Sequence, residues 1–365
     1  MKIQAKPLNI PMKVSFKHAS AERKMTDGVI AQVTRGVQTG YGEGCPRSYV
    51  TGETTQGALK WIEKVASEVS EKCTSVEALK NWMLTHREEI NQNPAAWCAL
   101  ETAILDLLAK ESNVSVERFL GLEDPKGYFQ YTAVISDGSR DVMITTLTKY
   151  LKCEFLDYKL KISSDLKKDS DTIEIFKEMI VKPLGDQVRL RIDANNLWKG
   201  HGQLEVAIDY IRSLNYAFFA IEEPLSPRDA LGLSQFSVEL NTPVVLDESC
   251  LRVEDFELYQ GLPGSFIVNV RVSKMGGVIR SLEVVERARS LGWGVIVGAQ
   301  VGETSLLSRA ALIPARVAGE RLMAQEGAYG TLLIEQDPFE PVIMFGAGGR
   351  LQISEVNSGF GLCKI

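Results

Sequence analysis

Acidic residues follow several strand-like runs in the second half of the sequence, and their types suit metal chemistry. Asp193, Glu222 and Asp247 end three successive runs, 29 and 25 residues apart. Carboxylates without histidine or cysteine form a hard oxygen site that suits Mg²⁺, with Mn²⁺ as an alternative. An acid that only caps the following helix is an equally good interpretation for any one of them. Three such acids in succession, flanked by lysines, favour the metal site.

Two lysines, Lys159 and Lys161, lie two residues apart in the run FLDYKLKI and therefore share one face of a strand. Two ammonium groups beside a divalent cation repel each other, which favours the neutral amine on one of them. A lysine with a pKa near neutral pH can act as a general base. A solvated K-x-K on an edge strand is the weaker alternative, because a barrel has no edge strand and the neighbouring residues are apolar.

The elements that must position these side chains fall into three regions. Residues 1–123 combine β-rich runs with three helical segments, which predicts an α+β domain. In residues 124–340, eight strand-like runs alternate with helices, which predicts an α/β fold, a (β/α)8 barrel with its active site at the carboxyl ends of the strands. An open doubly wound sheet is the alternative. Residues 341–365 are expected to close the barrel or return to the first domain. The eight runs are YFQYTAVIS, FLDYKLKI, VRLRIDAN, YAFFAIEEP, TPVVLDES, SFIVNVRVSK, GWGVIVGAQ and GAYGTLLIE.

Composition excludes several classes of function. The 365 residues include 41 Lys and Arg against 47 Asp and Glu, so no basic surface for nucleic acid is expected. No apolar run approaches the ~18 residues of a membrane span, and the N-terminal stretch lacks the apolar core of a signal peptide. Six scattered cysteines without a C-x-x-C pair indicate reduced thiols. We therefore expect a cytoplasmic protein whose partner is a small molecule.

The order of the motifs resembles a known family. K-x-K, D-x-N, E-E-P, L-D-E-S and S-K-x-G-G follow one another at barrel spacing. This set is similar to that of the enolase superfamily, within its mandelate racemase and muconate lactonizing enzyme family. The nearest subgroup is that of the muconate cycloisomerases, which includes dipeptide epimerases and o-succinylbenzoate synthases. ALETAILDLLAK and GYGEGCP are similar to the capping-domain helix and to the loop that covers the active site. The resemblance implies an enolase-type modified TIM barrel with an N-terminal α+β capping domain.

The resemblance also implies roles for individual residues. Mg²⁺ on Asp193, Glu222 and Asp247 binds a substrate carboxylate, a base removes its α-proton, and the metal stabilises the resulting enediolate. Lys161 is implied as the base, and Lys159 holds the carboxylate. Glu303, which follows strand seven, is implied to act in catalysis. Asn195, in the D-x-N motif, is implied to bind the substrate. A homo-oligomer is the family expectation.

Two departures from the family bear on the reaction. The first is Arg271 in VNVRVSKMGG, where the family has a catalytic lysine. A guanidinium stays protonated, so Arg271 can orient a substrate or stabilise the enediolate but is a poor proton shuttle. Lys274 is an alternative, although it would lie on the opposite strand face. The second departure is Glu326 at strand eight, where dipeptide epimerases carry Asp-x-Asp for the substrate's ammonium group. It argues against an ordinary dipeptide.

Specificity is expected from two capping loops, residues 16–27 and 42–53. They offer His18, Arg47 and Tyr49 as substrate-binding candidates, together with Glu326 from the barrel, and Arg47 is the strongest of the loop residues. Basic residues on a solvated loop are the alternative. The sequence thus predicts a Mg²⁺-dependent isomerase, an epimerase or cycloisomerase, acting on a small carboxylate. The alternatives are a one-base lyase or dehydratase and a non-catalytic barrel that binds a metal or an acidic metabolite.

Overall fold

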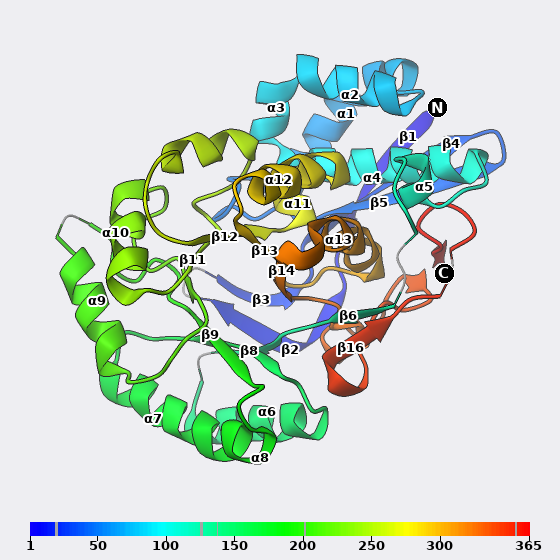
Figure 1. Cartoon of the computed structure of the whole chain (residues 1–365). Coiled ribbons are helices and arrows are strands. Elements are labelled where there is room, and N and C mark those ends of the chain that lie inside the picture. The colour runs from blue at the N-terminus through cyan, green and yellow to red at the C-terminus, as the bar shows by residue number, and fades with distance from the viewer. Residues whose placement is uncertain (19–20, 125–126, 137, 201, 355) are drawn as a thin grey trace.

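In the part of the chain that the structure describes, eight parallel strands form a barrel, which makes up the larger part of the molecule (Figure 1). The computed structural model describes residues 1–18, 21–124, 127–136, 138–200, 202–354 and 356–365, with only the backbone path at 14–18 and 21–23. Strand order in the sheet follows the chain, and Thr132 N donates to Gln325 O at 2.7 Å, which joins the last strand to the start of the first. The predicted barrel is therefore confirmed. Its strands are β7 (Ala133–Ile135), β8 (Asp157–Lys161), β9 (Arg189–Asp193), β10 (Ile221–Glu222), β11 (Val244–Leu246), β12 (Phe266–Val270), β13 (Gly294–Val297) and β14 (Leu322–Gln325).

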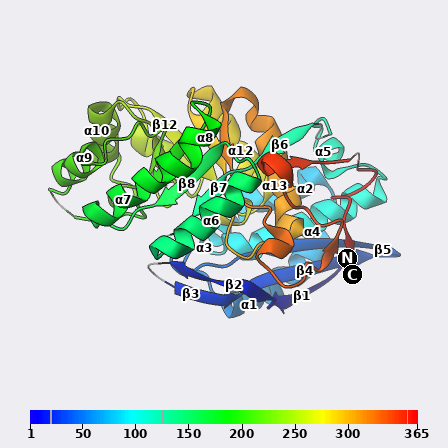
Figure 2. The ribbon, with the colours of Figure 1, turned by 90° about the horizontal axis from the view of Figure 1, so that it is seen from below.

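Helices follow most of these strands and cover the outside of the barrel (Figures 1 and 2). Inside it, a small apolar cluster takes one residue from each of five neighbouring strands or their approaches. Two of its members, Ala220 and Val245, lie two residues before Glu222 and Asp247, on the same strand faces. The apolar cluster therefore lies beneath the acids. The barrel helices are α6 (Arg140–Lys152), α7 (Leu166–Phe176), α8 (Lys182–Leu184), α9 (Leu204–Ser213), α10 (Ala230–Leu240), α11 (Val272–Met275), α12 (Val278–Ser290) and α13 (Ser305–Ala318).

The eighth strand is not where the sequence placed it. Strand β14 comes earlier, and the run GAYGTLLIE instead holds a short 3₁₀ helix, η4 (Gly330–Leu332). The backbone has positive φ at Gly327, Ala328 and Gly330, which is incompatible with an extended strand. The prediction failed because the β-rich composition after these residues outweighed the short run LMAQ before them.

In the described residues of the capping domain there are a three-stranded antiparallel sheet and five helices. The sheet has the order β1 (Lys2–Leu8), β4 (Gly28–Arg35), β5 (Gln38–Gly44). The segment expected as the first capping loop is instead a hairpin of β2 (Pro11–His18) and β3 (Ala21–Met25). The expected second loop begins inside strand β5. The helices are α1 (Thr55–Lys72), α2 (Val76–Thr85), α3 (Arg87–Gln92), α4 (Pro94–Glu111) and α5 (Val116–Phe119).

Strand β5 lies directly on helix α4, which is buried along nearly its whole length. Three alternate glycines of β5 face three small residues of α4, one helical turn apart. A Cβ atom on Gly42 would lie 2.0 Å from the carbonyl oxygen of Ala99, and Gly40 and Gly44 meet the helix backbone as closely. Only glycine permits this approach. The motif GYGEG therefore forms a packing face, whereas the family resemblance implied a loop over the active site.

Two buried acids of the capping domain cap helices of the barrel. Glu101 of α4 accepts hydrogen bonds from the backbone N–H groups of Val278 and Ile279 at the start of α12, both at 2.8 Å. Glu43 of β5 accepts from Thr304 N at 3.0 Å and from Leu307 N at 3.3 Å, at the start of α13. The first N–H groups of a helix have no partner within the helix, so these carboxylates satisfy them across the domain boundary.

We expect Glu101 to make stability depend on pH. Burial raises the pKa of Glu101 to about 7, against the opposing effect of its two backbone donors. Between the usual value of 4.5 and 7 the folded protein thus binds more protons than the unfolded chain, so its free energy of unfolding falls as pH rises. In Glu101→Gln this decrease should be missing. The free energy of unfolding of the wild type minus that of the variant should therefore fall by up to about 3 kcal/mol as the pH rises from 4.5 to 7.

Chemical denaturation at several pH values measures this difference. The exposed Glu77→Gln on α2 provides the matched control, because its curve should run parallel to that of the wild type. Parallel curves for Glu101→Gln as well would contradict the prediction.

The C-terminal segment returns to the capping domain. Strand β16 (Arg350–Gln352) first pairs with β6 (Tyr128–Gln130), and β17 (Cys363–Lys364) pairs with β15 (Phe339–Glu340). Between them, Phe360 N donates to Asp106 Oδ1 of α4 at 2.9 Å. The segment therefore contacts the start of the barrel region through β16 and the capping domain through Phe360. In the described ranges, no helix combines the length and apolar character needed to span a membrane.

Candidate active site

Three acids lie at the carboxyl ends of neighbouring strands. Asp193 and Glu222 end β9 and β10 and are paired in register, and Asp247 directly follows β11. Lys159 joins the first two, since its Nζ is 3.7 Å from Asp193 Oδ2 and 3.2 Å from Glu222 Oε2. Asp247 is bonded instead by Lys274 and Arg271. Within the described ranges, no three acids, histidines or cysteines surround one point closely enough to hold a metal as they stand. Lysine and arginine side chains of the protein itself form ion pairs with these acids.

The two lysines of β8 differ in their surroundings. Burial acts to lower the pKa of Lys159, but the carboxylates of Glu222, Glu326 and Asp193 outweigh it and raise the pKa above the usual range. Lys161 donates to Asn195 Oδ1 at 3.1 Å and lies 4.0 Å from Asp193 Oδ2. Burial lowers the pKa of Lys161, Asp193 opposes this, and the Lys159 ammonium lowers it further. Lys159 therefore holds its proton firmly, and Lys161 releases its proton more readily.

Glu326 follows β14 and is held by two cations. Its Oε1 lies 2.8 Å from Lys159 Nζ, and it is also paired with the fully buried Arg191 of β9. Arg191 is bonded in turn to Asp157 Oδ1 at 3.0 Å. Although burial opposes it, the charges of Lys159 and Arg191 hold the pKa of Glu326 far below its usual range. The sequence predicts that Glu326 binds substrate, but in the structure Lys159 and Arg191 already neutralise its charge.

Arg271 and Lys274, which follow strand β12, both bind Asp247. Arg271 pairs with the Asp247 carboxylate and donates to Gln300 Oε1 at 3.2 Å. Lys274 lies on the short helix α11 and not on a strand, so the strand-face argument does not apply to it. Its Nζ donates to Asp247 O, Asp247 Oδ1 and Asn269 O, at 2.7–2.8 Å. Burial, and then Arg271, lower the pKa of Lys274 to about 7. In the ammonium form of Lys274, these three acceptors engage all three protons.

Glu303 lies after β13, close to these groups. Its Oε1 accepts from Gln300 N at 2.6 Å, and Gln300 also binds Arg271. Burial raises the pKa of Glu303 to about 8, the Gln300 N–H opposes this, and Glu43 raises it further. At neutral pH Glu303 is therefore mostly a protonated carboxyl group that can donate a hydrogen bond.

The three substrate-binding candidates of the predicted capping loops are Arg47, Tyr49 and His18, and the structure places them as follows. Arg47 is fully buried, and its guanidinium donates to four backbone carbonyl groups, those of Thr26, Asp27, Pro46 and Val301. Arg47 therefore ties the capping segments to the β13–α13 loop, and its role in substrate binding stays a prediction. Tyr49 lies in a turn and is half-buried. His18 ends strand β2, and its side chain lies outside the described part of the structure.

Glu223, which the family resemblance implies as a supporting residue beside Glu222, and Glu248, which the sequence did not single out, lie next to the acids. Glu223 has a positive φ of 42° and accepts from Asp247 N at 2.6 Å and Ser249 N at 2.8 Å, which fixes the turn that carries Asp247. Glu248 has a buried Oε2 atom without a hydrogen-bond partner among the described residues. Burial, and then Glu223, raise the pKa of Glu248 to about 8. For Glu248 the only sequence signal was its adjacency to Asp247.

The fold and these side chains define a class: a (β/α) barrel with acids and lysines at the carboxyl ends of its strands and a capping domain docked against it. Residues 143–363 match the family described as Enolase C-terminal domain-like. The chain belongs to the enolase superfamily.

Relatives extend over nearly the whole chain. A hydrophobic dipeptide epimerase of Enterococcus faecalis is 25% identical over 99% of this chain and 98% of that protein. An N-succinyl-L-Arg/Lys racemase of Bacillus cereus is 23% identical over 83% of this chain and 79% of that protein. The structure of the Enterococcus faecalis dipeptide epimerase complexed with Mg and L-Leu-L-Tyr superposes with a TM-score of 0.82, at 23% identity over 99% of this chain and 98% of that one.

Proposed function

We propose that the protein is a divalent-metal-dependent isomerase that removes the α-proton of a small carboxylate substrate, as an epimerase or racemase. The observation that carries this proposal is the pair of unlike lysines on β8. Lys161, with a lowered pKa, lies beside Asp193, while Lys159 keeps its charge among the carboxylates. Relatives that are epimerases and racemases support the assignment.

Asp193, Glu222 and Asp247 would hold the metal. The donor set fits, because three buried carboxylates from adjacent strands are the hard oxygen ligands that Mg²⁺ prefers. The orphaned Oε2 atom of Glu248, buried nearby, is a further acceptor that a cation would satisfy. Bound Mg²⁺ supplies positive charge beside the substrate carboxylate, which makes the α-proton more acidic.

The protein's own groups then divide the work. Lys161 accepts the proton, and its hydrogen bond to Asn195 directs the amine. Lys159 provides a fixed positive charge for the substrate carboxylate. Glu303, with its pKa raised to about 8, donates a hydrogen bond as a neutral carboxyl group. Arg271 contributes charge from the opposite side of the barrel mouth.

One-base chemistry is the second candidate, and Arg271 is the observation that favours it. Epimerisation by two opposed bases needs a proton-exchanging group on each face, and a guanidinium stays protonated. With Lys161 alone, the same proton removal leads to elimination or cycloisomerisation. The two candidates share their first step and differ in whether a proton returns to the opposite face.

Proton exchange in D₂O tests the proposal. With Mg²⁺ and an N-acyl amino acid or dipeptide, we expect deuterium at the α-carbon, detected by NMR, and inversion, detected by chiral chromatography. Removal of Mg²⁺ by a chelator should abolish exchange, and added Mg²⁺ should restore it. Exchange without inversion, or an unsaturated or cyclised product, would favour one-base chemistry. Exchange that persists without any divalent metal would contradict the proposal.

The same assay should reveal a preference for substrates without a distal ammonium group. L-Ala-L-Leu and N-propionyl-L-Leu are nearly the same size and differ in the ammonium group. Because Glu326 is already paired with Lys159 and Arg191, we expect kcat/KM for the propionyl compound to be about tenfold higher. A preference for the dipeptide that Glu326→Gln removes would show that Glu326 binds the ammonium group after all.

A further inference from the structure

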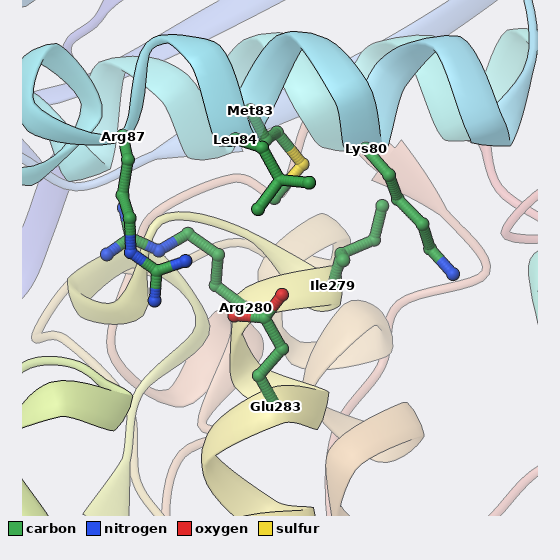
Figure 3. A pocket seen from close by; sticks show the side chains of 7 residues that line it. All are labelled: Lys80, Met83, Leu84, Arg87, Ile279, Arg280 and Glu283. Carbon is green, nitrogen blue, oxygen red and sulfur yellow. The ribbon is translucent and has the colours of Figure 1, made fainter.

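A cavity of about 130 Å³ between helices α2 and α3 and helix α12 favours no class of ligand (Figure 3). Its lining carries both signs of charge, from Lys80, Arg87, Arg280 and Glu283. Arg87 is already paired with Glu254. The interior of the barrel differs, because a buried amide there contacts one of the acids that are proposed to hold the metal.

Asn269 is a neutral polar residue inside the barrel. It lies on β12 two residues after Ile267, a member of the apolar cluster beneath the acids, so both side chains point into the same interior. Asn269 is fully buried, and its Nδ2 donates to Glu222 Oε1 at 3.1 Å. The other oxygen of Glu222, Oε2, lies 3.2 Å from Lys159 Nζ. Both oxygens of Glu222 are therefore held.

These two contacts fix the direction of the Glu222 carboxylate. Lys159 Nζ also lies 3.7 Å from Asp193 Oδ2, so Oε2 is the oxygen of Glu222 on the side of Asp193, while Oε1 is turned toward β12. A carboxylate without such contacts rotates and presents its oxygens in many positions. Because Asn269 holds Oε1, Oε2 stays on the side that Glu222 shares with Asp193.

Two neighbours fix Asn269 in turn. Lys274 Nζ donates to its backbone oxygen at 2.7 Å. Gly298, directly after β13, makes room for the amide, since a Cβ atom there would lie 2.2 Å from Asn269 Oδ1. This Oδ1 is buried without a hydrogen-bond partner among the described residues, which costs free energy. An apolar side chain would avoid that cost, so the amide is better explained by its bond to Glu222 than by stability.

We propose that Asn269 is a positioning residue that makes the metal site selective for Mg²⁺ over Ca²⁺. Mg²⁺ requires short bonds and nearly ideal octahedral geometry, whereas Ca²⁺ accepts longer bonds and flexible arrangements. A Glu222 carboxylate that rotates freely still serves Ca²⁺ but serves Mg²⁺ poorly. The inference rests on the metal site of the proposed function and adds the residue that sets its selectivity.

Isothermal titration calorimetry of the full-length protein with Mg²⁺ and with Ca²⁺, without substrate, tests this selectivity. Asn269→Leu keeps the side-chain volume and removes the donor. We expect it to raise the Kd for Mg²⁺ by at least about tenfold and that for Ca²⁺ by less than about threefold. Ile267→Val, a small change on the same strand face that leaves Glu222 untouched, should keep both constants.

The outcomes separate this inference from the metal site itself. A wild-type protein that binds neither metal would refute the metal site and the inference together. A wild-type protein that binds Mg²⁺, with no loss or with equal losses for the two metals in Asn269→Leu, would overturn the inference alone.

Two glycines at the ends of β13 provide a test that leaves Asn269 in the chain. In Gly298→Ala the new Cβ displaces the amide, so the Kd for Mg²⁺ should again rise more than that for Ca²⁺. In Gly294→Ala the new Cβ meets apolar side chains instead, the nearest atom being Met323 Cγ at 2.7 Å, and both constants should be kept. Wild-type selectivity in folded Gly298→Ala would overturn the proposal.

Discussion

Replacing Lys161 with methionine is expected to lower the rate of α-proton exchange by about 10³-fold, within the usual range for loss of a general base. Methionine keeps most of the side-chain volume and removes only the amine. Lys161 Nζ lies 4.0 Å from Asp193 Oδ2, whereas Lys159 Nζ lies 3.2 Å from Glu222 Oε2, so Lys161→Met should disturb the metal ligands less than Lys159→Met. Steady-state kinetics should therefore show a loss in kcat with a small change in KM.

Two companion variants make this result specific. Lys159→Met should raise KM as well as lower kcat, because Lys159 is expected to hold the substrate carboxylate. Lys167→Met, on the exposed face of α7, should behave as the wild type. If Lys161→Met keeps its exchange rate, another residue is the base and the central assignment is wrong.

The pH dependence of the α-proton exchange rate should follow the titration of Lys161. Because burial lowers the pKa of Lys161, the neutral amine becomes available at lower pH than for an ordinary lysine. Exchange should rise with pH as Lys161 loses its proton, and this rising limb should be absent from the residual activity of Lys161→Met.

Replacing Gly42 with alanine is expected to destabilise the protein by about 3 kcal/mol or more, at the upper end of the range for overpacking. The added methyl group would lie 2.0 Å from Ala99 O and 2.4 Å from Ala103 N. Both are backbone atoms of a buried helix, so they have no rotamer by which to move aside. Denaturant unfolding with a two-state analysis measures the effect.

Gly28→Ala is the matched control for this prediction. Gly28 lies in β4, the neighbouring strand of the same sheet, where a new Cβ would find its nearest atoms at 3.4 Å, an ordinary contact. It should change stability by less than about 1 kcal/mol. Equal stability of the two variants would mean that β5 shifts freely on α4, contrary to the packing described.

The barrel and the group of strand-end residues could be predicted because both depend on local spacing. An acid after a buried strand lies at the carboxyl edge of a parallel sheet wherever the strands are, so Asp193 and Glu222 needed only the strand positions. Lys159 and Lys161 share a face because alternate residues of a strand do. The eighth strand was misplaced, yet Glu326 still lies at its end because β14 stops just before it.

The partners of these residues could not be predicted, since they come from distant parts of the chain. Arg47 sits beside a Gly-rich bend in the sequence, and nothing local indicates that Val301, 254 residues away, binds its guanidinium. Glu326 reads as a free acid until Arg191 is placed opposite it. Lys274 was assigned to a strand because the turn into helix α11 depends on packing beyond its own motif.

The acids that cross between the two domains have a consequence for how such proteins can be recombined. Helices α12 and α13 begin on Glu101 and Glu43, which belong to the other domain. A barrel produced by itself would leave the start of α12 uncapped, and α13 would keep only its own cap, the Thr304 side chain, and lose the acceptor of Thr304 N and Leu307 N. A capping domain grafted from a relative would need acids at the same places. The specificity of this scaffold is therefore better altered by exchanging short segments than by exchanging whole domains.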